Sequence, residues 1–246
     1  MTRFDGVAGH TGVTDARGWP PATGGDMSYT GHVQAGGRPD VRELPGLTVT
    51  KVSVGPYDNN AYLLRCTATG ERLLIDAANE AARLLELVGD GPLGRVVTTH
   101  RHQDHWEALA EVADATGAAV TAHPFDAEPL PVPVTDPVEH GDTIAFGAVT
   151  LEVIHLRGHT PGSIALLYDA EGAAGHPHLF TGDSLFPGGV GNTWGDPTRF
   201  AQLLGDVEER VFDRLPDTTW FYPGHGDDST LGRERPSLPE WRRRGW

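Results

Sequence analysis

The stretch Thr99–His105, with the sequence THRHQDH, decides the fold of this 246-residue chain. It places three histidines and one aspartate within six positions, directly after the apolar pair Val96–Val97 and Thr98. A strand that ends in such a run can direct four ligating side chains into one small volume. Neutral imidazole is the commonest metal ligand, and an added carboxylate suits a divalent ion whose coordination is open for chemistry. The run therefore predicts a metal site at the end of a strand.

The spacing of this run indicates two metal positions. His100 and His102 share a face where the backbone is extended, because side chains alternate along an extended chain. Asp104 and His105 then turn toward a second position. The intervening Arg101 and Gln103 are expected to point away and to tolerate substitution.

Composition limits the class of protein. The length, 38% hydrophobic residues and 22% charged residues fit one soluble globular domain. A net charge of -15 with a single lysine argues against nucleic-acid binding, which needs clustered Lys and Arg. The apolar runs are far shorter than the ~20 residues of a membrane span, and the first residues lack the apolar region of a signal peptide. The lone Cys66 leaves no intrachain disulfide, so we expect a cytoplasmic protein.

The chain divides into three parts. Residues 1–45 are rich in Gly, Pro, Thr and Asp and predict a loosely ordered N-terminal extension, in which Met27 is an alternative start. Residues 236–246 predict a solvated C-terminal tail. Residues 46–235 alternate strands and helices and predict an α/β domain with two sheets face to face and helices outside. Strands are expected at 47–54, 61–66, 72–75, 95–99, 118–122, 163–168, 178–181 and 218–222 and in two parts around Gly147 within 142–156, with helices at 80–88, 106–115 and 198–212.

Three later motifs resemble the first in kind. They are GHTPGS at 158–163, TGDS at 181–184 and YPGHG at 222–226, and each follows a predicted strand. Glycine beside a candidate ligand permits unusual backbone angles and a close approach to an ion. Functional groups gather on such loops at one edge of a rigid scaffold. His159, Asp183 and His225 are therefore further candidate ligands.

The motifs THRHQDH, GHTPGS, TGDSLF and YPGHG, in this order and spacing, resemble the metallo-β-lactamase superfamily in its glyoxalase II-like (hydroxyacylglutathione hydrolase-like) branch. The resemblance covers about residues 46–235. It implies an αββα sandwich of two mixed sheets with a two-metal site at one edge. It assigns His100, His102 and His159 to one metal, Asp104, His105 and His225 to the other, and Asp183 to both. Zinc is the default metal, with iron and manganese as alternatives, because His and carboxylate ligands discriminate poorly among them.

The resemblance also implies an activity. A hydroxide that bridges two divalent ions would attack a small thioester, such as a hydroxyacyl-thiol conjugate, since metal binding lowers the pKa of water from ~15.7 to about 7. Asp104 is expected to act in catalysis by orienting that hydroxide, and the thiolate leaves without a strong general acid. The alternatives are a persulfide dioxygenase with one iron on His100, His159 and Asp183, and a lactonase of the same fold. An exported β-lactamase and a nuclease are disfavoured.

The substrate side is less sharply marked. Trp194, in the glycine-rich loop 186–196, is a candidate pocket wall, and a plain connecting loop is the alternative. Arg233 and Arg235 match positions that hold the acidic end of a glutathione-type thiol in the branch. The thiol carrier, the acyl group and the oligomeric state are left open. His155 is a candidate partner behind the ligands, and Cys66 is expected to be buried. Asn59, Asn60 and Tyr62 fit either the site or a turn. The remaining histidines are expected on the surface or at caps: His10, His32, His123, His140, His176 and His178.

Overall fold

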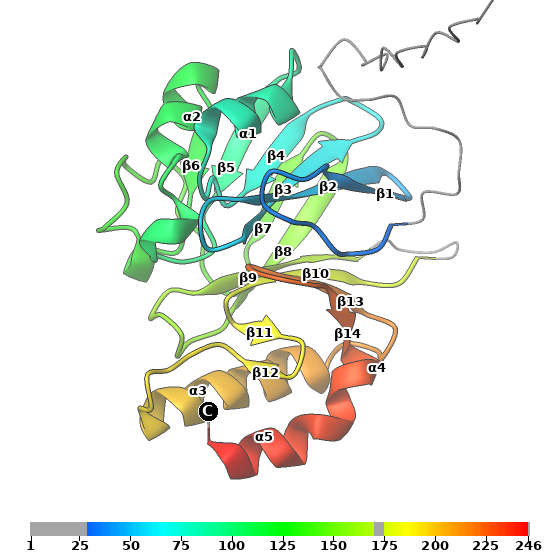
Figure 1. Cartoon of the computed structure of the whole chain (residues 1–246), viewed down its shortest axis with the longest axis vertical. Helices are drawn as coiled ribbons and strands as arrows, with labels where there is room; N and C mark the ends of the chain where they lie inside the picture. Colours follow the sequence, from blue (N-terminus) through cyan, green and yellow to red (C-terminus); the bar gives the residue numbers. More distant parts are fainter. Residues whose placement is uncertain (1–28, 170–174, 246) are drawn as a thin grey trace, which may run out of the picture.

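The computed structural model describes residues 29–169 and 175–245. Within these residues two six-stranded sheets lie face to face, and helices cover the outer face of each (Figure 1). The predicted αββα sandwich is confirmed. His10 and the alternative start at Met27 lie outside the described residues.

The first sheet carries the histidine-rich run. Its strands β1 to β6 follow one another in chain order, antiparallel from β1 to β4 and parallel from β4 to β6. Because β4, β5 and β6 are parallel, their carboxyl ends lie at the same edge of the sheet. The elements of this half are β1 (Asp40–Leu44), β2 (Leu47–Val54), β3 (Asn59–Cys66), β4 (Arg72–Ile75), α1 (Ala81–Val88), β5 (Leu93–Val97), α2 (Leu109–Thr116) and β6 (Ala119–Thr121), with short 3₁₀ turns at Gln103–His105 and Pro124–Asp126.

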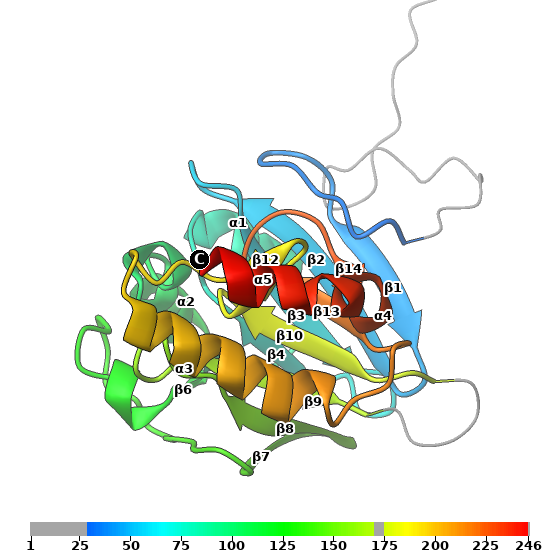
Figure 2. The ribbon, with the colours of Figure 1, turned by 90° about the horizontal axis from the view of Figure 1, so that it is seen from below.

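The second sheet has the order β14-β13-β10-β9-β8-β7, and β10 and β13 are parallel. The helices α3 and α5 cross its outer face (Figure 2). A small hairpin of β11 and β12 follows β10. The bounds are β7 (Thr143–Phe146), β8 (Val149–His155), β9 (Ile164–Tyr168), β10 (His178–Gly182), β11 (Leu185–Phe186), β12 (Gly189–Val190), α3 (Pro197–Val207) continued by a π-helical turn (Glu208–Phe212), β13 (Trp220–Pro223), β14 (Ser229–Thr230), α4 (Leu231–Glu234), a 3₁₀ turn (Arg235–Ser237) and α5 (Leu238–Arg244).

Three apolar cores hold these layers together. The central core joins the two sheets and includes Leu64, Leu73, Leu151, Phe180 and Tyr222, all fully buried. One outer core lies under α1 and α2, and the other lies under α3 and α5. Burial of each large apolar side chain contributes about 1.5–3 kcal/mol. Strand β4 is buried on both faces between two cores, and its sequence is therefore the apolar run RLLI rather than an alternating pattern.

The first sheet begins earlier than the predicted domain boundary at residue 46. Strand β1 lies within the predicted extension and pairs antiparallel with β2, with Asp40 opposite Lys51 and Leu44 opposite Leu47. It is an edge strand whose residues are alternately exposed and half-buried. Such a strand lacks the apolar run that marks the inner strands, so its sequence DVREL resembled the preceding loop.

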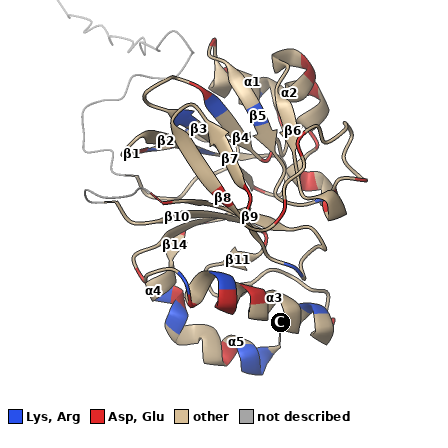
Figure 3. Cartoon of the chain, turned by 180° about the vertical axis from the view of Figure 1, so that it is seen from behind, with Lys and Arg blue, Asp and Glu red and all other residues tan. Residues whose placement is uncertain are grey.

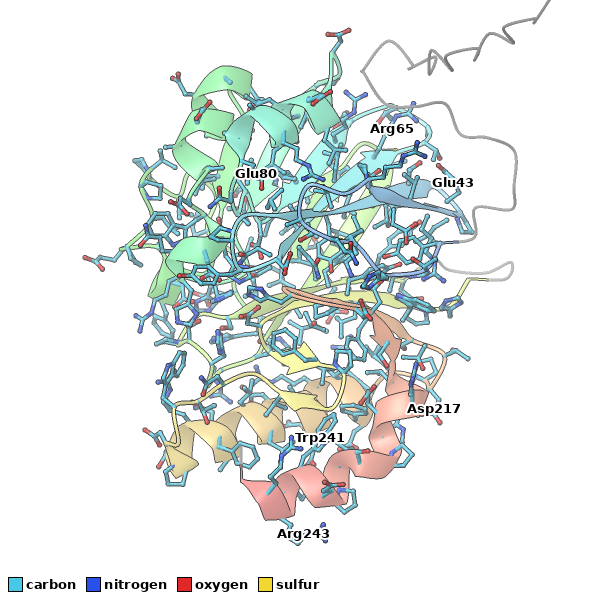
Figure 4. All side chains as sticks on the ribbon, viewed as in Figure 1. Glu43, Arg65, Glu80, Asp217, Trp241 and Arg243 are labelled. Atoms are coloured by element: carbon cyan, nitrogen blue, oxygen red, sulfur yellow. The ribbon has the colours of Figure 1, made fainter. Side chains whose placement is uncertain are left out.

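The predicted C-terminal tail instead contains the helix α5. Trp241 is buried against Phe212, with ring centroids 6.1 Å apart, and it fixes the helix to the outer core. Arg243 projects away from the body of the protein, whereas Trp241 points into it (Figure 4). The three arginines that follow Trp241 led to the prediction of a solvated tail, although Trp241 itself is buried.

The surface carries charges of both signs. Figure 3 shows basic residues beside acidic ones on α3, α4 and α5. Arg242 Nη2, for example, lies 2.7 Å from Glu208 Oε1. Among the described helices, none has the length and apolar character needed to cross a membrane.

Candidate metal centre

The histidine-rich run starts where β5 ends, and its backbone changes direction within three residues. His102 is extended, with φ -69° and ψ 138°, and the 3₁₀ turn Gln103–His105 begins directly after it. The extended part presents His100 and His102 together, and the turn redirects Asp104 and His105. Arg101 and Gln103 are exposed, as expected for the residues between the ligands.

Two groups of potential ligand atoms lie side by side. In the first, His102 Nδ1 is 3.0 Å from His100 Nε2 and 2.9 Å from His159 Nε2. In the second, His225 Nε2 is 3.2 Å from His105 Nε2 and 3.4 Å from Asp104 Oδ2. Within each group every ligand atom lies within 4.8 Å of the others.

Asp183 lies between the two groups. Its Oδ2 is 3.6 Å from both His159 Nε2 and His225 Nε2, and its Oδ1 is 3.4 Å from His105 Nε2. Asp183 follows β10, His159 follows β8 and His225 follows β13, whereas the other ligands follow β5. Loops of both sheets therefore bring together all seven residues that the sequence singled out as ligands.

The outer nitrogens of the rings fix which nitrogen faces inward. His159 Nδ1 lies 2.9 Å from the Asn192 carbonyl oxygen, and His225 Nδ1 lies 2.9 Å from the Tyr57 carbonyl oxygen. A carbonyl only accepts, so each Nδ1 donates its hydrogen outward. When these rings are neutral, their Nε2 lone pairs point into the cluster, the orientation that metal-binding histidines take.

Burial keeps the first group neutral. It lowers the pKa of His159 to about 4, and it lowers the pKa values of His100 and His102 as well. Rings that are neutral at pH 7 offer lone pairs without first losing a proton.

The second group attracts positive charge. Burial opposes a charge on His225, but its contacts with Asp104 and Asp183 raise its pKa to about 9. For His105, burial is likewise outweighed by Asp183 and Asp76, which raise its pKa well above the ordinary value. In the absence of another cation these raised pKa values favour a proton between the two rings, and a metal ion that binds here must displace it.

The residues fit two divalent ions. Asp183 Oδ1 is buried and has no hydrogen-bond partner among the described residues. A Cβ atom at Gly224 would lie 2.1 Å from this oxygen, and one at Gly191 would lie 1.8 Å from the Asp183 carbonyl oxygen, so no larger residue fits. Five imidazole nitrogens and two carboxylates form a donor set suited to zinc, iron or manganese.

The sequence reasoning missed Asp76. This buried residue accepts hydrogen bonds from the backbone N–H of Thr99 at 2.7 Å and from Thr99 Oγ1 at 2.8 Å. Its Oδ2 is also 2.8 Å from His105 Nδ1, so it orients that ring. An aspartate directly after the apolar strand β4 was the available signal, since Asp183 follows β10 in the same way.

Two more residues support the ligand loops. Asn59 Nδ2 donates to Asp104 Oδ2 at 2.9 Å, which places this residue at the site rather than only in a turn. Asp126 accepts from the backbone N–H groups of Arg101 at 3.1 Å and Gly162 at 2.9 Å. It thereby joins the loop after β5 to the loop after β8.

Trp194 lies against the first group of ligands. Its ring stacks on His159, with centroids 5.3 Å apart and planes 27° apart, and 55% of the residue stays exposed. The guanidinium of Arg199 lies 4.6 Å from the same ring, and the Trp194 backbone is left-handed with φ 55°. Conformations of this kind in residues other than glycine are costly and cluster at functional sites.

Of the two arginines predicted to bind substrate, Arg235 makes its hydrogen bonds within the fold, whereas Arg233 stays exposed. Arg235 donates through Nε to Asp217 Oδ1 at 2.5 Å and through Nη1 to the Phe212 carbonyl oxygen at 2.6 Å. It ties the end of the π-helical turn to the segment after β14, because the last carbonyls of a helix need donors. Arg233 is exposed on α4. Positional matching could not distinguish a structural arginine from a binding one.

The other histidines among residues 29–169 and 175–245 lie outside the cluster. His123 accepts from the Phe125 N–H at 3.2 Å and stacks on His155, with centroids 4.0 Å apart. His155 Nε2 donates to the Pro161 carbonyl oxygen at 2.7 Å and so supports the loop of His159. His178 is buried beside Tyr222 rather than on the surface. Cys66 is buried, as predicted.

Comparison with known proteins agrees with this geometry. Residues 54–225 match the family model described as Metallo-beta-lactamase superfamily. A protein named hydroxyacylglutathione hydrolase from Fuscovulum blasticum is 36% identical over 170 residues, which are 68% of this chain and 62% of that protein. The chain thus spans about three fifths of the length of that relative.

Two solved structures share the fold. ETHE1 from Myxococcus xanthus aligns with a TM-score of 0.69 and 28% identity, covering 79% of this chain and 84% of that one. TTHA1623, solved in a di-iron-bound form, aligns with a TM-score of 0.64 and 34% identity, covering 77% of this chain and 98% of that one.

Proposed function

The chain belongs to the metallo-β-lactamase superfamily, and we propose that it is a two-metal hydrolase of small thioesters, acting in the cytoplasm on hydroxyacyl-thiol conjugates. The observation that carries the proposal is the position of Asp183 between two complete groups of ligands. The similarity to proteins named hydroxyacylglutathione hydrolase supports the substrate class.

The proposal assigns a role to each group of residues. His100, His102 and His159 would hold one ion, Asp104, His105 and His225 the other, and Asp183 both; zinc is the metal we propose, with iron and manganese as alternatives. When bound, the pair would supply a hydroxide nucleophile at neutral pH and a Lewis acid for the substrate carbonyl oxygen.

Asp104 is the proposed catalytic residue. Hydrogen bonding to His225 and Asn59 lowers the pKa of its carboxyl group, although burial opposes the shift, so it is ionised at neutral pH. The Asn59 contact engages Oδ2. An ionised carboxylate can accept a hydrogen bond from the attacking group and hold it in line with the carbonyl carbon.

The chemistry of the leaving group favours a thioester as the substrate. A thiol has an ordinary pKa of about 8.5, so the thiolate departs without a strong proton donor. Trp194, stacked on His159 at the edge of the cluster, is the residue we propose to contact the substrate. Arg233, exposed on α4, stays a candidate for binding a thiol carrier, whereas Arg235 is engaged within the fold.

Metal analysis together with a substrate panel tests the proposal. The protein should contain two divalent ions per chain and release free thiol from hydroxyacyl thioesters, and varying the thiol portion should identify the carrier. A protein that carries both ions and releases no thiol from any carrier would refute the thioester assignment. Turnover of lactones under the same conditions would then assign a lactonase.

A persulfide dioxygenase is the second candidate. It needs a single iron, and His100, His159 and Asp183 lie together as that assignment requires. The complete second group of ligands argues for hydrolysis instead. One iron per chain, with oxygen-dependent sulfite formation from a persulfide, would reverse the ranking.

A further inference from the structure

The only lysine of the chain, Lys51, is buried in the interior and paired with Asp228. Its Nζ lies 2.6 Å from Asp228 Oδ1, 2.7 Å from the Gly31 carbonyl oxygen and 2.7 Å from the Gly226 carbonyl oxygen. An ammonium group has three hydrogens to donate, and these three acceptors use all of them.

Asp228 accepts three hydrogen bonds in all, one of them from Lys51. Its Oδ2 accepts from Tyr29 Oη at 2.5 Å and from Trp220 Nε1 at 2.9 Å. Burying two charges costs desolvation free energy, and this cost offsets most of the attraction between them. A buried ion pair of this kind therefore adds little to the stability of the fold. Its value lies in the geometry that it imposes on the segments it joins.

Those segments include the loop that carries His225. The Gly226 carbonyl oxygen, next to His225, accepts from Lys51 and also from Asn60 Nδ2 at 2.9 Å. On the other side of His225, the Pro223 carbonyl oxygen accepts from Asn60 Nδ2 at 2.9 Å and from Tyr62 Oη at 2.6 Å. Side chains of β2 and β3 thus fix the backbone on both sides of this ligand.

The Gly31 carbonyl oxygen, which also accepts from Lys51, belongs to the segment Tyr29–Gly31, which we call the N-terminal strap. The strap precedes the part of the chain that matches the family model, which begins at residue 54. It contacts the His225 loop again through the Asp228 N–H, which donates to the Gly31 carbonyl oxygen at 3.3 Å. Lys51 is therefore the point where β2, the strap and the His225 loop are held together.

We propose that Lys51 is a positioning residue for His225, and that its contacts with Gly226 and Asp228 set the affinity of the second group of ligands for its metal ion. The compact ammonium suits this task because three acceptors converge on it from different directions, whereas a planar guanidinium is a fork. The inference rests on the proposed two-metal function.

Zinc binding by the full-length protein tests this role. Lys51→Met leaves Asp228 buried without its partner and is therefore paired with the double variant Lys51→Met/Asp228→Asn, which removes both charges. Val49→Ala is the matched control, since Val49 is a fully buried residue of β2 in the core between the sheets. Zinc affinities are measured by competition with a chromophoric chelator, without any substrate.

In the wild type and in Val49→Ala, we expect two zinc ions per chain. In the double variant, we expect one of the two zinc ions to bind at least about tenfold less tightly and the other to bind unchanged, a loss within the range for partners behind metal ligands. Hydrogen exchange of the metal-free double variant should be faster at residues 223–228 than in Val49→Ala.

Two outcomes would overturn the proposed role of Lys51 and leave the proposed two-metal function intact. One is a folded double variant that keeps both zinc affinities and the exchange rates of residues 223–228. The other is an equal loss of both affinities, which would mean that Lys51 only stabilises the fold. A wild type that binds a single zinc would instead overturn the two-metal function together with this inference.

Discussion

The Nε2 atoms of His105 and His225 face each other at 3.2 Å, while the Nδ1 atom of each ring is held by an oxygen, from Asp76 and Tyr57 respectively. If both rings are neutral, two lone pairs oppose one another across this distance, which is unfavourable. A proton or a metal ion between the rings removes the conflict. The arrangement of these two rings therefore favours a positive charge between them.

The second group should bind metal with a steep pH dependence. The pKa of His225 is raised to about 9, above the ordinary ~6.5, so protonation stabilises the metal-free protein fully below pH ~6.5. That contribution is lost as the pH rises through about 9, and zinc binding strengthens over the same window. His159, with its pKa lowered to about 4, has no proton to release there. Chelator competition at pH 6, 7 and 8 should show one pH-dependent and one nearly constant affinity; two equal slopes would contradict the assignment.

Asp104 and its neighbour Gln103 should differ sharply. Asp104→Asn should lower kcat/KM for a thioester by more than about 100-fold, beyond the range seen for partners that only support metal ligands. Gln103→Asn should leave kcat/KM within about twofold, because an exposed side chain away from such features contributes little. Metal contents are measured alongside. Equal losses in the two variants would contradict the assignment of Asp104 as a ligand and of Gln103 as a residue that only separates ligands.

Asp76 should matter although it is not among the predicted ligands. Asp76→Asn places an amide against Thr99 and His105, where the carboxylate accepts three hydrogen bonds. We expect zinc affinity of the second group to fall by about 10–100-fold, since the ring loses the partner that orients it. Thr99→Ser keeps both donors and serves as the control. A normal affinity in Asp76→Asn would show that His105 needs no such support.

Trp194 should affect substrate binding rather than metal binding. Trp194→Ala should raise KM for thioesters with little change in kcat or metal content, because the ring lies beside the ligands without being one. Trp194→Phe should restore part of the affinity. An unchanged KM in Trp194→Ala would remove this residue from the binding surface.

Arg235→Ala should leave KM unchanged and instead lower the free energy of unfolding by about 2 kcal/mol, the range for hydrogen bonds to a charged group. The affected contacts are those with Asp217, Phe212 and Leu215. Denaturant unfolding measures the loss, and Arg233→Ala, an exposed residue of α4, is the control. A raised KM without a loss of stability would restore the substrate role predicted for Arg235.

Two strands were predictable from local patterns, because LTVTKVSV at 47–54 alternates and is β-branched and RLLI at 72–75 is apolar. The runs at 47–54 and 72–75 became β2 and β4 with identical bounds. The edge strand β1 escaped prediction because it is paired on one side only and keeps polar residues. Helix α5 escaped prediction because just two of its seven residues, Leu238 and Trp241, are buried in the outer core.

The ligands were predictable from chemistry, whereas their supports were not. His100, His159 and Asp183 occur beside glycines or other ligands, in a pattern that few structural needs produce. Lys51 lies within β2 and Asp76 directly follows β4, and their partners are distant in the chain. Only the folded arrangement reveals that Lys51 contacts a residue 175 positions away.

The ligand groups combine loops from both sheets, and this imposes an order on their assembly. His100 and His102 are synthesised early, but their group is incomplete until His159 has been made and β8 has packed against its neighbours. The other group waits for His225, after β13. A growing chain therefore offers only fragments of each set, and metal capture should coincide with the closing of the sandwich. Loading then reports that both halves of the protein have folded correctly.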